Sequence, residues 1–222
     1  MGCSRWRGDC ILMRFPELDA VTVDGYGTLL QLTDPVPALR AALAAHGVER
    51  SDEDVARAFR AEVAHYRPLA HEGRDADSLA ALRRDCVGVF LHDLGDPLDV
   101  GTFVDAFMGA LVFEEVPGAS ETLRRLRQRG LKLGVVANWD CALPVHLARL
   151  RLDALVDTVV TSARAGVAKP DPAIFELALA ELGVDAGRAL HVGDEPCDEE
   201  GSRAAGMAFA PAPLSTAFAG WQ

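Results

Sequence analysis

The sequence predicts an α/β fold in which a block of helices interrupts a parallel sheet. Short apolar runs alternate with helical segments from residue 113 onward, which is typical of right-handed βαβ units. Residues 33–112 contain no strand pattern, and their alanines and leucines recur at three- and four-residue spacing, as in packed helices. We therefore expect a Rossmann-like core of residues 15–32 and 113–222 with a helical insert of residues 33–112.

The elements follow from local signals. The first strand is expected at residues 20–23, an apolar run that ends at Asp24. Helices in the insert begin at residues that favour helix N-termini, such as Ser51, which precedes three acidic residues. Their expected ranges are 36–46, 52–66, 77–93 and 100–108. After the insert we expect helices at 119–129, 142–149, 172–182 and 199–205, and strands at 132–136, 158–161, 189–192 and 207–210.

Composition indicates a soluble globular protein. Half of the 222 residues are hydrophobic, which is enough for a substantial core. The formal charge is −11 and the basic residues are scattered, so we expect no nucleic-acid partner. No apolar run approaches the roughly 20 residues of a membrane helix, so we expect no membrane association. Residues 1–14 fit no periodic pattern, and we expect a disordered leader there.

The five cysteines, at positions 3, 10, 86, 141 and 197, form no C-x-x-C pair. This spacing indicates neither a disulfide framework nor a zinc site, and it favours a reducing, cytoplasmic location. We expect Cys141 and Cys197 to be small packed thiols, and His191 to pack on its strand.

Polar residues follow three of the expected strands, and a lone lysine lies in a loop between them. Open α/β sheets bind ligands at the carboxyl ends of their strands, so these segments are the candidates for a functional site. They are the segment Asp-Gly-Tyr-Gly-Thr at 24–28, the pair Ala-Asn at 137–138, the loop Lys-Pro-Asp-Pro at 169–172 and the segment Gly-Asp-x-x-x-Asp at 193–198.

In order and spacing, these four segments resemble the haloacid dehalogenase superfamily, from about residue 18 to residue 210. The resemblance implies that the insert is a mobile cap over the active site and that the first, second and last of these segments converge at one edge of the sheet. It also implies that Asp24 is the nucleophile. It implies a Mg²⁺ ion held by Asp24, the backbone carbonyl of Tyr26 and Asp194, with Asp198 one shell further out. Lys169 is then expected to pair with Asp24 and with the transferred phosphoryl group.

The remaining residues of the resembled site bind phosphoryl oxygens. Thr28, Asn138 and the backbone N–H groups of the turn at Gly25 are expected to donate hydrogen bonds there. Each assignment has an alternative: Asp194 and Asp198 flank an expected helix start, where acids act as caps, and Lys169 alone reads as a solvated loop lysine.

Two positions depart from the superfamily pattern. Its phosphatases carry a second Asp, an acid–base group, where this chain has Tyr26, and a phenol with a reference pKa of about 10 is a poor base at neutral pH. Ala137 stands where the superfamily usually has Ser or Thr, so one hydroxyl donor is missing. Tyr at the first of these positions also occurs in the true 2-haloacid dehalogenases, which need no metal.

Three functions stay open at this point. Retained Asp194 and Asp198 favour a Mg²⁺-dependent phosphatase of a small phosphorylated metabolite; the alternatives are a 2-haloacid dehalogenase and a non-catalytic binding or regulatory protein of the same fold. The sequence leaves the substrate and the oligomeric state open. A polar cluster between two helices of the insert reads either as a substrate-facing surface or as a solvated face. Its members are Arg60, His65, Tyr66, Arg67, His71 and Arg74.

Overall fold

A computed structural model describes residues 18–219, so the leader expected at residues 1–14 lies outside the described part. The centre of the fold is a five-stranded parallel sheet in the order β5-β4-β1-β6-β7. The central strand, β1, pairs with β4 on one side and with β6 on the other. The strands are β1 (Ala20–Val23), β4 (Lys132–Ala137), β5 (Thr158–Thr161), β6 (Ala189–Gly193) and β7 (Ala208–Pro211). The predicted α/β class with a parallel sheet is therefore confirmed.

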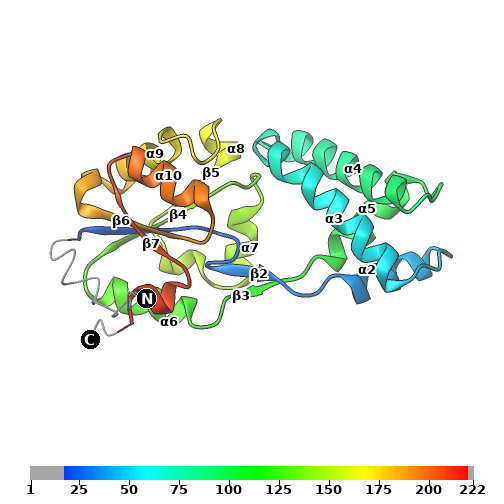
Figure 1. The fold of residues 1–222 in the computed structure, drawn as a ribbon, viewed down its shortest axis with the longest axis horizontal. Helices are drawn as coiled ribbons and strands as arrows, with labels where there is room; N and C mark the ends of the chain where they lie inside the picture. The colour runs from blue at the N-terminus through cyan, green and yellow to red at the C-terminus, as the bar shows by residue number, and fades with distance from the viewer. Residues whose placement is uncertain (1–17, 220–222) are drawn as a thin grey trace, which may run out of the picture.

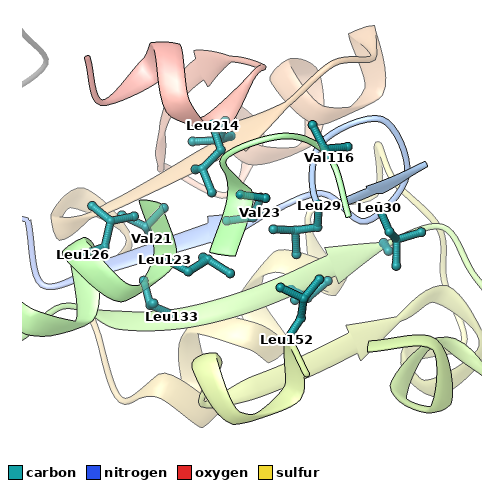
Figure 2. Close-up of a cluster of buried hydrophobic side chains, with 14 of the residues drawn as sticks. Val21, Val23, Leu29, Leu30, Val116, Leu123, Leu126, Leu133, Leu152 and Leu214 are labelled. Atoms are coloured by element: carbon teal, nitrogen blue, oxygen red, sulfur yellow. The ribbon is translucent and has the colours of Figure 1, made fainter. Parts of the chain in front are cut away.

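Helices cover both faces of the sheet (Figure 1). On one face, alternate strand residues such as Val21 and Leu133 pack against Leu123 and Leu126, as strand geometry requires (Figure 2). Helices α6 (Ala119–Gln128), α7 (Leu143–Arg149) and α11 (Leu214–Ala217) contribute to that cluster. Helix α9 (Ala173–Leu182) covers the opposite face, with α10 (Pro196–Ala204) against it. Shorter elements are α8 (Ser162–Ala165), η1 (Ala70–Glu72), η2 (Asp153–Leu155) and η3 (Ala186–Arg188).

Four helices form the insert, which lies beside the α/β core (Figure 1). They are α2 (Val36–Ala45), α3 (Asp52–Leu69), α4 (Ala76–Asp93) and α5 (Val100–Ala110). Their apolar faces form a hydrophobic cluster of their own, with Phe90, Phe103 and Phe107 at its centre. None of the described helices is long and apolar enough to cross a membrane.

The chain enters and leaves the insert through two short antiparallel strands that the sequence did not predict. They are β2 (Leu30–Leu32) and β3 (Phe113–Glu115), with Leu30 opposite Glu115. Each strand has three residues, and their pairing joins segments more than eighty residues apart, so no local pattern marks it.

Several predicted helix boundaries differ from the observed ones, by one to three residues. Helix α3 continues through Pro68, beyond its expected end at residue 66. Helix α4 begins at residue 76, one residue early, because Asp75 and Ser78 form a capping box. Helix α10 begins at Pro196 and not at residue 199; proline is well suited to a first helical position because its missing N–H has no partner there in any case.

Candidate active site

Lys169 lies at the centre of the strand-end cluster. Its ammonium group bonds to the carboxylate of Asp24 and, at 2.6 Å, to Oδ1 of Asp198. Asp24 follows β1, and its backbone N–H donates to the carbonyl of Val192 in β6. The lysine side chain is only 3% exposed, so Lys169 is not a solvated loop residue. Burial alone lowers the pKa of Lys169, but the charges of Asp24 and Asp198 outweigh burial and raise it.

Asn138 holds the backbone of this lysine in place. Its side-chain amide donates to the carbonyl of Lys169 at 3.0 Å, and its Oδ1 accepts from the N–H of Lys169 at 2.7 Å. These two bonds hold the loop of Lys169 against the end of strand β4. A contact of Asn138 with phosphoryl oxygens stays a prediction, with one amide hydrogen still available for it.

Asp198 is both a helix cap and part of the site. Its Oδ2 accepts from the N–H of Glu195 at 3.0 Å, and its Oδ1 accepts from Lys169 and, at 3.0 Å, pairs with Nε2 of His191. Burial raises the pKa of Asp198, but His191 and Lys169 outweigh it and lower that pKa to about 2.

His191 does more than pack on its strand. It is fully buried, with Nδ1 at 2.8 Å from the hydroxyl of Thr22. Burial lowers the pKa of His191 to about 4, so the ring is neutral, with Nε2–H donating to Asp198 and Nδ1 accepting from Thr22. His191 therefore fixes the orientation of Asp198.

Three carboxylates crowd this edge of the sheet. Oxygen atoms of Asp24, Asp194 and Asp198 all lie within 4.8 Å of one another. Burial, then repulsion from Asp198 and Asp194, raises the pKa of Asp24 to about 7 against the attraction of Lys169. Burial and repulsion from Asp198 also raise the pKa of Asp194. A site with surplus negative charge and hard oxygen donors fits a divalent cation such as Mg²⁺.

The donors open to a cation are those of Asp24 and Asp194, because both oxygens of Asp198 already accept hydrogen bonds. Gly27 leaves room for this arrangement: its φ is +80°, and a Cβ there would lie 2.4 Å from Oδ2 of Asp194.

A cavity of about 500 Å³ opens above Asp24, between the core and the insert. Asp24, Tyr26, Asn138, Lys169 and Asp194 all line it. The other three site residues expected from the sequence, Gly25, Thr28 and Asp198, do not line the cavity. Asp198 is fully buried behind Lys169, to which it is bonded. A Cβ added at Gly25 would lie 3.2 Å from the Cβ of Ala137, and the buried hydroxyl of Thr28 has no hydrogen-bond partner among the described residues.

Only part of the polar cluster expected in the insert lines the cavity. Tyr66 and Arg67 line the cavity, and Arg67 pairs with Glu195 of the core. His65 bonds to Asp85 outside the cavity. Arg60 and Arg74 are exposed, and His71 is partly exposed; none of the three lines the cavity.

The sequence analysis did not identify several of the residues that line the cavity. Glu62, Arg83 and Cys86 lie on the amphipathic helices α3 and α4, where charge and spacing do not show which face meets the core. His146, on α7, stacks edge-on against Phe113 at 4.7 Å.

Comparison with known proteins extends these observations. A family model described as haloacid dehalogenase-like hydrolase matches residues 18–206. The chain is 36% identical over 205 residues to the mouse (Mus musculus) haloacid dehalogenase-like hydrolase domain-containing protein 3, covering 86% of this chain and 80% of the relative. It is 43% identical over 84 residues to a glyceraldehyde 3-phosphate phosphatase of Pyrococcus abyssi, 36% of this chain and 34% of that protein.

A solved structure shares the fold. L-2-haloacid dehalogenase from Xanthobacter autotrophicus, with chloropropionic acid covalently bound, superposes with a TM-score of 0.66 at 24% identity, covering 88% of this chain and 77% of that one. At this identity the likeness concerns the fold alone.

Proposed function

This chain belongs to the haloacid dehalogenase-like hydrolase family, and we propose that it is a Mg²⁺-dependent phosphatase of a small phosphorylated metabolite, acting through a phosphorylated Asp24. The position of Asp194 gives the strongest support for a metal-dependent activity. Its carboxylate lies beside Asp24, and no described Lys, Arg or His forms an ion pair with it. A relative named as a phosphatase supports the substrate class.

In the proposed reaction, an oxygen of Asp24 attacks the phosphorus of the ester and the bond from phosphorus to the leaving-group oxygen breaks. Water then hydrolyses the acyl phosphate, which frees Asp24 and releases inorganic phosphate. Lys169 orients Asp24 and pairs with the phosphoryl oxygens as a point charge. Bound to Asp24, the Tyr26 carbonyl and Asp194, Mg²⁺ would neutralise the carboxylates and the phosphoryl oxygens.

The proposed site has no carboxylic acid at the position of the acid–base group. Tyr26 occupies the position of the acid–base group, and its side chain is 51% exposed at the cavity wall. Without an acid there, the leaving oxygen must depart as an anion and take its proton from water. Loss of a positioned acid–base group typically costs about 10²- to 10⁴-fold in rate.

We propose that the insert acts as a cap, because it supplies Tyr66, Arg67 and other walls of the cavity. A cytoplasmic location remains our proposal and is supported by the free thiols of Cys86, Cys141 and Cys197.

A 2-haloacid dehalogenase is the second candidate, and Tyr26 is the observation that favours it. In that reaction Asp24 would displace halide from carbon, with no need for Asp194 or a metal. A screen with phosphate esters, acyl phosphates and 2-haloacids, with and without Mg²⁺, separates the candidates, with Asp24→Asn as the control. Mg²⁺-dependent phosphate release supports the phosphatase, metal-independent halide release the dehalogenase, and inactivity on all substrates a binding role.

A further inference from the structure

The cavity above Asp24 has a mainly apolar wall. On the core side, the ring of Trp139 lies 5.3 Å from that of Phe113 and 6.4 Å from that of Tyr26, between centroids. The insert adds Phe59, Val63, Leu82 and Met108. A sugar would leave its hydroxyl groups without partners against this surface, whereas a flat apolar leaving group would pack on it.

Arg83 is the exception in this wall. It lies on α4, lines the cavity, and its Nε is buried with no hydrogen-bond acceptor among the described residues. The other cationic residues of the lining have partners: Lys169 pairs with Asp24 and Asp198, and Arg67 with Glu195. A buried N–H without a partner is costly, so an acceptor placed there by a ligand stabilises the complex.

Acidic residues share the cavity lining with Arg83, but those nearby have other partners. The carboxylate of Asp140 accepts hydrogen bonds from the hydroxyl of Tyr66 and from the N–H of Ala142. Glu62, in the same lining, is buried beside Cys86, and burial raises its pKa to about 7. His146, which also lines the cavity, has its pKa lowered by burial. The charge of Asp140 raises that pKa, and the charges of Arg149 and Arg83 lower it. In the part of the chain that the structure describes, Arg83 forms no ion pair.

We propose that Arg83 binds a second anionic group of the substrate, so that the enzyme acts on phosphate monoesters whose leaving group is apolar and itself carries an anion, such as a carboxylate. This inference rests on the proposed phosphatase function and names its substrate class. The planar guanidinium forms two parallel hydrogen bonds to a carboxylate or a phosphate, which gives Arg83 geometric selectivity as well as charge.

Binding to the Asp24→Asn variant with Mg²⁺ tests this without turnover. The probes are 4-carboxyphenyl and 4-(carboxymethyl)phenyl phosphate, their uncharged carboxamides, and 1,4-phenylene bisphosphate, each titrated by calorimetry. For at least one spacing, the acid should bind about tenfold or more tightly than its amide, the size expected of a charge-assisted hydrogen bond. The bisphosphate shows whether phosphate serves in place of carboxylate.

A second substitution in the same Asp24→Asn background assigns this preference to Arg83. Arg83→Met should remove it, and Arg83→Lys should retain part of it. Arg84→Met is the matched control, since Arg84 is the next residue of α4, is exposed and lies outside the cavity lining; its preference should equal that of the parent. Thermal unfolding of each variant checks that it is folded. Equal affinity for acids and amides in the parent, or a preference that survives Arg83→Met, would overturn the assignment.

Turnover by the wild-type chain separates this inference from the function on which it rests. If the chain hydrolyses the carboxamide-bearing aryl phosphates as readily as the carboxylate-bearing ones, the role of Arg83 is refuted but the phosphatase function is supported. If the carboxylate-bearing probes bind more tightly but no phosphate ester is hydrolysed, the phosphatase function is refuted and the anion-binding role of Arg83 is supported.

Discussion

The hydroxyl of Tyr66, on helix α3, donates a hydrogen bond of 2.8 Å to Oδ2 of Asp140, which follows strand β4. Asp140 is buried, and its Oδ1 accepts from the N–H of Ala142 at 2.7 Å. Beside it, the N–H of Cys141 donates to the carbonyl of Gly73 at 2.8 Å. The insert and the core are thus joined by hydrogen bonds at the rim of the cavity.

Tyr66→Phe should lower the free energy of unfolding by about 1.5 to 3 kcal/mol, because it removes a hydrogen bond to a buried charged group. Urea unfolding at neutral pH measures this difference. Tyr26→Phe removes the same atom from a half-exposed ring, whose hydroxyl has no partner among the described residues, and should change stability by less than about 0.5 kcal/mol. Equal effects of the two changes would mean that the Tyr66–Asp140 bond is not formed in solution.

Asp194→Asn should abolish or strongly weaken Mg²⁺ binding, since Asp194 and Asp24 are the donors left open in the carboxylate cluster. Calorimetric titration of the purified protein with MgCl₂ measures this. Glu200→Gln, a change of the same charge at an exposed position of α10, is the control and should bind as the wild type does. Mg²⁺ affinity unchanged by Asp194→Asn would place the metal elsewhere, and a wild type that binds no Mg²⁺ would favour the dehalogenase.

Glu62 should make stability depend on pH. Burial raises its pKa from 4.5 to about 7. The folded state therefore binds a proton more tightly than the unfolded state does, and stability falls as pH rises through this window. Glu62→Gln should remove that loss, which is of the order of 3 kcal/mol by pH 8.

Unfolding free energies at pH 4 and pH 8 measure the effect of Glu62→Gln. The variant should resemble the wild type at pH 4 and exceed it in stability at pH 8. Glu49→Gln, at an exposed position, should show no such difference between the two pH values. A variant that is less stable than the wild type at pH 8 would show that Glu62 is charged and paired there.

Tyr26 should make the first chemical step depend steeply on the leaving group. Aryl and acyl phosphates should react faster than alkyl phosphates, with a burst of leaving group if the phosphorylated enzyme accumulates. Tyr26→Asp should raise the rate on alkyl phosphates by up to about 10²-fold, by restoring an acid–base group. If the wild type is indifferent to the leaving group and the variant is no faster, another residue must supply the proton.

The strand-end site was predictable because its signals are local. An apolar run that ends in Asp24, and the same pattern before Asp194, predicts strand ends, and parallel strands bring such ends together. The bonds that lock Asn138 to Lys169, and the pairing of β2 with β3, join distant segments and leave no periodic trace.

Substrate-facing residues of the insert were harder to identify. Six polar residues of the insert were considered as a possible substrate-facing surface, and of these only Tyr66 and Arg67 line the cavity. Arg83 was not expected, because Arg83 and Arg84 are equivalent in sequence and only the rotation of α4 directs one of them to the cavity. Helix rotation depends on packing across the whole insert, which a local pattern does not show.

The central claim is that Asp24 carries the phosphoryl group, and mass spectrometry of the acid-quenched protein tests it most directly. The wild-type chain, mixed with Mg²⁺ and an aryl phosphate and quenched within the first turnover, should gain the mass of one phosphoryl group on the peptide that contains Asp24. Asp24→Asn should gain none. A wild type that hydrolyses the ester with no such adduct, or an adduct of the same yield in Asp24→Asn, would contradict the account.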